Sequence, residues 1–260
     1  MRLAGLKFGL FAIATAGLAV LGLYFHGFAP VWRPLPAWVP WHDIWVNACD
    51  LLLLAASVSL CFKRTASSSV MVIAAYITAW AVTRTIPVAL NPLSFGAWYG
   101  VCEALAPLVA ALILGALVRS RALRAAQCLF GISCVVFGLA HFVYADFTAS
   151  MVPGWLPGHL GFAYLTGLGH IAAGLGLAAG IFSRLAATLE AIMMSLFGLL
   201  VWVPTLFARP PPQWATPPQN QWSELALTLL LAASAWIVAT SIRSQDRGGI
   251  SGKPGRLVLG

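Results

Sequence analysis

Eight long apolar segments divide this chain, and they restrict its fold more than any other feature of the sequence. A helix needs about 20 apolar residues to cross the hydrocarbon core of a bilayer, which is roughly 30 Å thick. Lipid offers no hydrogen bonds to an exposed backbone, so segments of this length are expected to be helices. The eight predicted spans are residues 6–27, 44–62, 69–89, 98–118, 124–145, 160–182, 186–207 and 222–242.

The composition argues against a water-soluble fold. Of the 260 residues, 60% are hydrophobic and 8% are charged, whereas about 25% of residues are charged in a typical soluble domain. The chain therefore has too few polar residues to cover a water-facing surface. We expect a lipid bilayer as its surroundings, and the predicted fold class is an all-α, polytopic membrane protein with eight transmembrane helices.

The basic residues are distributed in a way that predicts the orientation of the chain. Twelve of the fifteen lie on one side of the predicted membrane, and three lie towards the other side. Because Lys and Arg accumulate on the cytoplasmic side, both termini are expected in the cytoplasm, and we expect the bacterial inner membrane as the location. The net charge of +8 follows from this sorting and not from a continuous basic patch, so no nucleic-acid partner is expected. The twelve are Arg2, Lys7, Lys63, Arg64, Arg119, Arg121, Arg124, Arg184, Arg243, Arg247, Lys253 and Arg256.

Two distant stretches of the sequence are nearly alike. Leu35–His42 (LPAWVPWH) and Val152–His159 (VPGWLPGH) share Pro, Trp, Pro and His at four of eight positions. Similar segments that far apart indicate an internal repeat. Each copy contains four spans, an even number, so both copies enter the membrane in the same direction as parallel four-helix repeats. The predicted division is a first repeat at 1–120, a second repeat at 121–243 and a flexible cytoplasmic tail at 244–260.

Ionisable residues occur within the predicted spans, and several occupy matched positions in the two copies. Such groups are costly inside a membrane, so each one is expected to have a partner or a function. The matched pairs are His26 with His141, Asp50 with His170, and Glu103 with Glu224. Arg84 in the third span carries the opposite charge to the carboxylates. We expect these seven candidate ligand-binding residues to form one polar cluster towards the outer face.

This predicted cluster has two interpretations. Imidazole and carboxylate groups can exchange protons, which fits a site for a quinone ring or another polar head group. Alternatively, the side chains only reach the aqueous boundary and cap helix ends. Cys49 and Cys102, which precede two of the acids, are either a redox pair or small buried hydrophobes. The Cys and His spacings are not those of a metal site, so no metal is expected.

Two further expectations concern the second copy. Glu190, near the start of the seventh span, is interpreted as a helix-start carboxylate that the helix dipole favours. The sixth span is rich in glycine, and small residues let helix backbones approach closely. We therefore expect the sixth span to be a central, tightly packed helix.

The second copy also resembles a known family. It carries, in order, His141 at the end of a span, the Pro/Trp segment Val152–Pro157, the segment Phe162–Leu175 and then Ser183–Ala187. Over residues 124–242 this order resembles the DoxX-like family of small four-span membrane proteins. Some members of that group are subunits of thiosulfate:quinone oxidoreductases or of other membrane redox systems. The first copy matches weakly, and a tandem of eight spans departs from the usual single unit.

The function that these features predict is that of an integral membrane subunit of a redox system. It is expected to bind a quinone, or another lipophilic ligand, near the outer polar cluster and to have a protein partner in a membrane redox complex. Two alternatives stay open: a non-catalytic assembly or accessory protein, and a small-molecule carrier between the two repeats. A carrier needs a continuous polar path, and the inner halves of the spans are almost wholly apolar.

The predicted orientation is testable with reporter fusions. A reporter fused at Ser244 is expected in the cytoplasm and one at Thr148 outside it, because the basic connections mark the cytoplasmic side. Paired alkaline phosphatase and fluorescent-protein activities measure the two locations. An extracytoplasmic signal at Ser244, or a cytoplasmic one at Thr148, contradicts the scheme.

Overall fold

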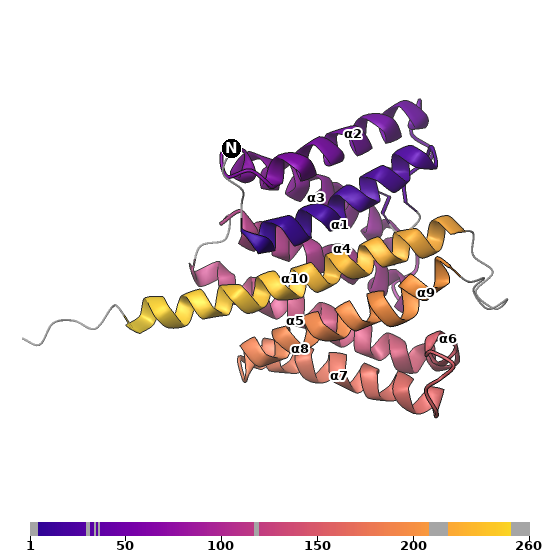
Figure 1. The fold of residues 1–260 in the computed structure, drawn as a ribbon, viewed down its shortest axis with the longest axis vertical. Coiled ribbons are helices and arrows are strands. Elements are labelled where there is room, and N and C mark those ends of the chain that lie inside the picture. Colours follow the sequence, from indigo (N-terminus) through magenta and orange to yellow (C-terminus); the bar gives the residue numbers. More distant parts are fainter. Residues whose placement is uncertain are drawn as a thin grey trace, which may run out of the picture.

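The structure is a computed structural model that describes residues 5–29, 32, 33, 35, 37–116, 120–207 and 218–250. Of the side chains within these ranges, those of 120, 121 and 243–250 are outside the description. The described residues form helices joined by turns and short loops. Most of the long helices lie along a common direction (Figure 1).

The helices follow one another with short connections. In chain order they are α1 (Leu6–Tyr24), α2 (His42–Leu60), α3 (Ala66–Leu90), α4 (Phe95–Leu114), α5 (Ser120–Val143), α6 (Ala145–Met151), α7 (His159–Ala179), α8 (Ser183–Phe197), the π-helix η1 (Gly198–Trp202), α9 (Val203–Thr205) and α10 (Pro218–Ile250).

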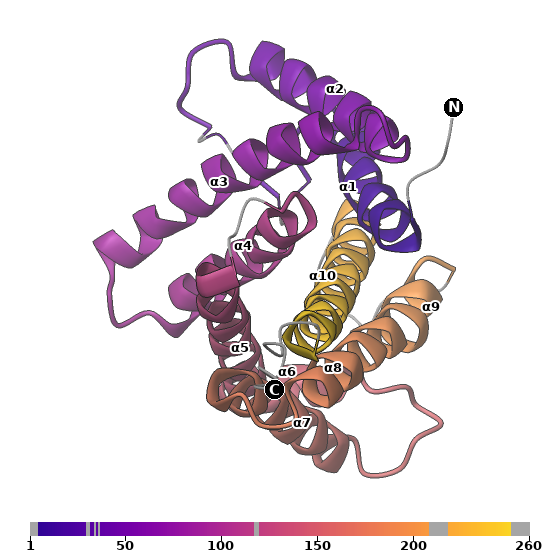
Figure 2. The same cartoon turned by 90° about the vertical axis from the view of Figure 1, so that its left-hand side faces the viewer.

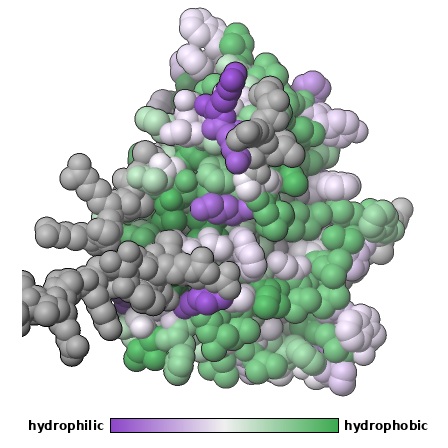
Figure 3. Space-filling view, turned by 60° about the vertical axis from the view of Figure 1, so that its left-hand side comes forward, coloured by the Kyte–Doolittle hydropathy of each residue, from purple (hydrophilic) through white to green (hydrophobic). Residues whose placement is uncertain are grey.

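Eight helical segments within the described residues are long and apolar enough to cross a membrane. They coincide with the eight predicted spans, and the seventh combines α8, η1 and α9 over Ser183–Thr205. Figure 3 shows that apolar side chains cover much of one face of the molecule. The eight predicted apolar helices are therefore confirmed, and they suggest a multi-pass membrane protein.

Two connections differ from what the sequence predicts. The short helix α6 occupies part of the loop expected at 146–159. Helix α10 continues to Ile250, so the stretch expected to be a flexible tail from residue 244 begins as helix. The rest of that predicted tail, 251–260, lies outside the described residues.

The long helices pack against one another without a clear division, and for description we call α1 to α4 the first unit and α5, α7, α8 with η1 and α9, and α10 the second unit. Within the first unit α1 packs on α2, α2 on α3 and α3 on α4, and within the second α5 packs on α7, α7 on α8 and α8 on α10. Between the units α4 packs on α5, α1 on α10 and α4 on α10. Figure 2 shows α10 in the middle of this arrangement and α7 at its edge.

Burial follows this arrangement. In the most apolar 18-residue stretch of α10, 72% of the residues are buried, against 33% in that of α7. The expectation that the glycine-rich sixth span is the central helix is therefore wrong. A helix at the edge of the molecule still needs small residues where it meets a single close neighbour.

That neighbour is α5, and glycines face glycines along the contact. A Cβ built on Gly131 would lie 2.7 Å from the carbonyl oxygen of Gly174, and one on Gly138 would lie 2.5 Å from that of Gly167. Real Cβ atoms do not approach a backbone oxygen so closely. The two helices are therefore in backbone contact at two points seven residues apart, and the prediction of tight packing for this span is confirmed.

This contact generates a stability prediction. Gly174→Ala is expected to lower the thermal stability of the detergent-purified protein, by about 1–3 kcal/mol of unfolding free energy, because its Cβ would overlap the backbone of α5. Gly161→Ala in the same helix is the matched control, since nothing lies within 4 Å of its Cβ position. The control should be neutral or slightly stabilising because Ala favours helix. Equal melting temperatures for the two variants would contradict the backbone contact.

Candidate functional site

A buried histidine and a buried glutamate face each other in the second unit. His170 in α7 and Glu190 in α8 place Nδ1 and Oε1 2.8 Å apart, and the two residues are 1% and 2% exposed. The second carboxylate oxygen, Oε2, is buried and has no hydrogen-bond partner among the described residues. The Cys134 thiol of α5 lies beside the same carboxylate. His170 and Glu190 are each other's partner. Without this contact, either ionisable group would be isolated among apolar helices.

A second imidazole lies against this pair. The rings of His141 and His170 have centroids 5.0 Å apart. The His141 Nδ1 atom lies 2.9 Å from the Phe137 carbonyl oxygen. A carbonyl only accepts, so Nδ1 carries a proton and Nε2 is the acceptor of the neutral ring. His141 is half-buried, and so it extends the site from the buried pair to the helix surface.

Two phenylalanines complete the surroundings of the histidines. Phe197 stacks on His141 with centroids 6.0 Å apart and an interplanar angle of 27°, and Phe137 meets the His170 ring nearly edge-on at 6.3 Å. Phe197 is the last residue of α8, directly before η1. Pro204 lies in α9 just after η1 and has no N–H to donate to the carbonyl four residues earlier, which favours a wider turn at this place.

The first unit buries a different acid. Asp50 in α2 is 1% exposed, and the Tyr76 hydroxyl of α3 donates to its Oδ1 over 3.2 Å. Gly22 of α1 leaves the space for this carboxylate, because a Cβ there would overlap Asp50 Oδ2. That oxygen is buried and has no hydrogen-bond partner within the described part of the chain.

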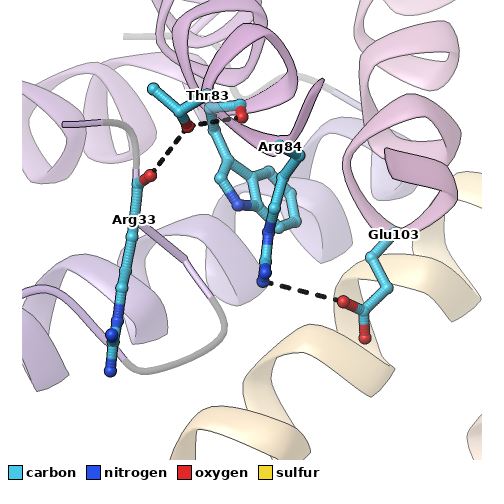
Figure 4. A network of polar contacts seen from close by, with 5 residues as sticks. Arg33, Thr83, Arg84 and Glu103 are labelled. Atoms are coloured by element: carbon cyan, nitrogen blue, oxygen red, sulfur yellow. Dashed lines mark hydrogen bonds and ion pairs between the residues drawn. The ribbon is translucent and has the colours of Figure 1, made fainter. Parts of the chain in front are cut away.

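Stacked aromatic side chains extend from Asp50 along α3. Trp32 lies on Tyr76 at 5.3 Å between centroids and on Trp80 at 4.4 Å. Trp32 comes from the loop after α1, and the loop is tied to α3 because the Thr83 hydroxyl donates to the Arg33 carbonyl over 3.0 Å, as Figure 4 shows. Both tryptophans are fully buried.

An ion pair lies at the far end of this stack, where the two units meet. Arg84 Nη2 is 3.7 Å from Glu103 Oε2, and Figure 4 shows the guanidinium of α3 pointing towards the carboxylate of α4. Glu224 of α10 lies within electrostatic range of both groups. The Arg84 guanidinium also lies over the Trp80 ring, 5.8 Å from its centroid. One cation therefore serves two carboxylates from different units.

Tyr99 connects this group with the second unit. Its side chain lies beside Glu103, and its ring is 5.6 Å from that of Phe137, which in turn contacts His170. Polar and aromatic side chains thus follow one another from Asp50 to Glu190. We call this series the polar–aromatic chain: Asp50, Tyr76, Trp32, Trp80, Arg84, Glu103, Tyr99, Phe137, His170, Glu190.

The structure therefore distributes the seven candidate residues instead of gathering them into one cluster. Arg84, Glu103 and Glu224 come together, His141 and His170 come together, and Asp50 lies with Tyr76. His26 is exposed, directly beyond the end of α1, with a φ of 51°.

The cysteines do not form a disulfide. Cys49 and Cys102 are both free, and Cys102 is buried.

Glu190 is the residue that sequence reasoning misjudged. Its interpretation as a helix-start carboxylate is wrong, because it lies seven residues after Ser183, the first residue of α8, and pairs with His170. The available signal was its isolation: between Arg184 and the end of this span the sequence contains no other charged residue. Tyr76, Trp32 and Tyr99 carried no such signal, because aromatic residues are common in apolar helices.

The fold and the buried polar pairs suggest the class of multi-pass membrane proteins. Apolar helices with paired ionisable groups between them are typical of multi-pass membrane proteins that use buried polar sites. Comparison with protein-family models, with curated proteins and with solved structures finds no match.

The Asp50 site generates a test by double-mutant cycle. Gly22→Ala is expected to cost about 1–3 kcal/mol, because the new Cβ overlaps the Asp50 carboxylate. In an Asp50→Ala background the same change should cost almost nothing, since the carboxylate is gone. Thermal unfolding in detergent measures all four corners of the cycle. Gly9→Ala, with nothing within 4 Å of its Cβ position, is the matched control in α1; additive effects in the cycle would contradict the contact.

Proposed function

We propose that this protein is an integral membrane subunit of a redox system that binds a quinone, or a chemically similar lipophilic ligand, at His141, His170 and Glu190. The observation that carries the proposal is the buried His170–Glu190 pair at 2.8 Å with a second imidazole against it. A structural role alone needs only one partner for a buried group. Two imidazoles and a carboxylate in contact form a set that can take up, hold and pass on a proton.

We also propose that the chain consists of two parallel four-helix repeats. Exchanging α1 with α5 and α4 with α10 turns the α1–α10 contact into the α5–α4 contact, so the packing pattern is compatible with a pseudo-twofold axis. The matched residues support it further. Gly22 lies four residues before His26, as Phe137 lies four residues before His141. Asp50 lies over Gly22, and its counterpart His170 likewise contacts Phe137. Both matched residues also bind a side chain from the next long helix: Asp50 binds Tyr76, and His170 binds Glu190.

In the proposed orientation both termini lie in the cytoplasm of a bacterial inner membrane, so that α7 begins at the outer face and the depth of the site is measured from there. His170 lies eleven residues after His159, the first residue of α7, which is about 16 Å along the helix at 1.5 Å per residue. His141 lies two residues before the end of α5, with its ring 5.0 Å from that of His170, and so between the pair and the outer face. Protons would thus pass between the outer boundary and a pair near the middle of the bilayer.

The chemistry of a quinone matches this arrangement. Its reduction consumes two electrons and two protons, and its carbonyl oxygens accept hydrogen bonds. A protonated His141 ring could donate a hydrogen bond from Nε2 to a quinone oxygen, and the nearby His170–Glu190 pair could replace the proton that His141 gives up. The electrons come from a redox partner protein, in keeping with the resemblance of residues 124–242 to the DoxX-like family, which itself stays a prediction.

The accessory-protein alternative is favoured by one observation. His170 and Glu190 are almost completely buried, so they are as well suited to fixing α7 against α8 as to chemistry. The carrier alternative is disfavoured, because α4 and α10 pack directly on each other and their buried residues are mainly Ala and Leu.

Lipid analysis of variants discriminates between a ligand site and a packing device. Gently purified parent protein is expected to retain quinone, and His141→Ala to retain about tenfold less, because one hydrogen bond to the ligand is lost. Glu190→Gln should lower occupancy or quinone-dependent electron transfer while the protein stays folded. His42→Ala is the control, since His42 contacts the exposed Asp43 and not the site. If folded variants and parent carry the same quinone and activity, the accessory role takes the lead.

A further inference from the structure

A second polar site lies at the other end of the second unit. A cavity of about 680 Å³ opens between the first turns of α5 and α8 and the later part of α10. Its polar lining includes Arg124 and Gln127 from α5 and Ser183, Arg184 and Thr188 from α8. This is the end of the helices where basic residues concentrate, and in the proposed topology it faces the cytoplasm.

Arg124 is held rigidly at this cavity. Its Nη1 and Nη2 atoms donate to the carbonyls of Leu177 and Ala178, each over 2.6 Å, at the C-terminal end of α7. Gly180 then turns the chain with a φ of 78°, and a Cβ there would lie 3.1 Å from Nη2. Arginine has five N–H donors, so this anchoring leaves donors for a further acceptor.

A second guanidinium and a helix end face the same cavity. Arg184 is exposed in the first turn of α8, and Phe182 at the N-cap provides no side-chain hydrogen bond to that end. Among the described residues that line the cavity, none is acidic. The lining therefore carries two positive charges and favours an anion with several oxygen acceptors.

An apolar surface begins at the edge of the cavity. Phe182 is 77% exposed, and Leu185, Leu189 and Ile192 are each at least half exposed. The latter three are spaced four and three residues apart, so they form one stripe along α8. A ligand that bridges the cavity and this stripe has a charged head and a long apolar tail.

We propose that this cavity binds the phosphate group of an anionic phospholipid, with an acyl chain along the α8 stripe. Basic pockets between helices on the cytoplasmic side of a membrane commonly receive such head groups. The proposal rests on the membrane location proposed above but not on the His170–Glu190 site, so either can fail without the other. Inorganic phosphate shares the head-group chemistry but not the tail, and the experiment separates the two.

The test uses the full-length protein in a neutral detergent with added dioleoyl phosphatidylglycerol or dioleoyl phosphatidylcholine. Native mass spectrometry is expected to show tighter retention of the phosphatidylglycerol, and thermal unfolding a higher melting temperature with it. Arg184→Gln should weaken phosphatidylglycerol retention about fivefold, the effect of one basic contact with an anionic lipid surface. Arg184 is exposed, so its replacement is expected to leave the packing of the core unchanged.

Arg64→Gln is the matched control, because Arg64 is an exposed basic residue in the corresponding turn of the first unit. It should retain phosphatidylglycerol like the parent. Equal retention of the two lipids, or equal losses in the two variants, overturns the proposal. Stabilisation by millimolar inorganic phosphate as large as that by phosphatidylglycerol also overturns it, because the site would then recognise a free anion.

Discussion

The pairing of ionisable side chains between helices is the constraint on which this structure depends. In hydrocarbon, apolar helix surfaces gain little by leaving lipid for one another, whereas an unpaired ionisable group costs roughly a few kcal/mol. Among the described side chains, each buried acid is met from another helix: Asp50 by Tyr76, Glu103 by Arg84, and Glu190 by a histidine. These contacts specify which helices are neighbours, which the apolar contacts around them cannot do.

Glycine supplies the space that such pairs require. Gly22 leaves room for the Asp50 carboxylate, and a Cβ on Gly100 would lie 3.4 Å from an Arg84 nitrogen. In the α5–α7 contact the glycines have another role, since they bring the two backbones together with no side chain between them. Glycine therefore makes room for a polar side chain in the first unit and allows close backbone contact between two helices in the second.

The sequence predicts the helices well because their signal is local: length and apolar composition decide each span independently. The matched sequence positions also identify Asp50 and His170 as polar residues of the interior, and both are 1% exposed. What the sequence could not supply was the partner of each. Tyr76 and Trp32 belong to the site only through packing between segments distant in sequence. Glu190 resembles a helix-start carboxylate in the sequence because only its contact with another helix reveals that it is buried.

The two units differ most in the segment that follows their first long helix. In the first unit this segment inserts Trp32, fully buried, against Tyr76 and Trp80. In the second unit it forms α6, which buries none of its residues. An indole thus fills the space beside Tyr76 in the first unit, and α6 contributes no buried side chain of this kind in the second. Similar stretches of sequence therefore do not produce the same interior: Trp32 of the first connecting segment is fully buried, whereas Trp155 of the second is 71% exposed.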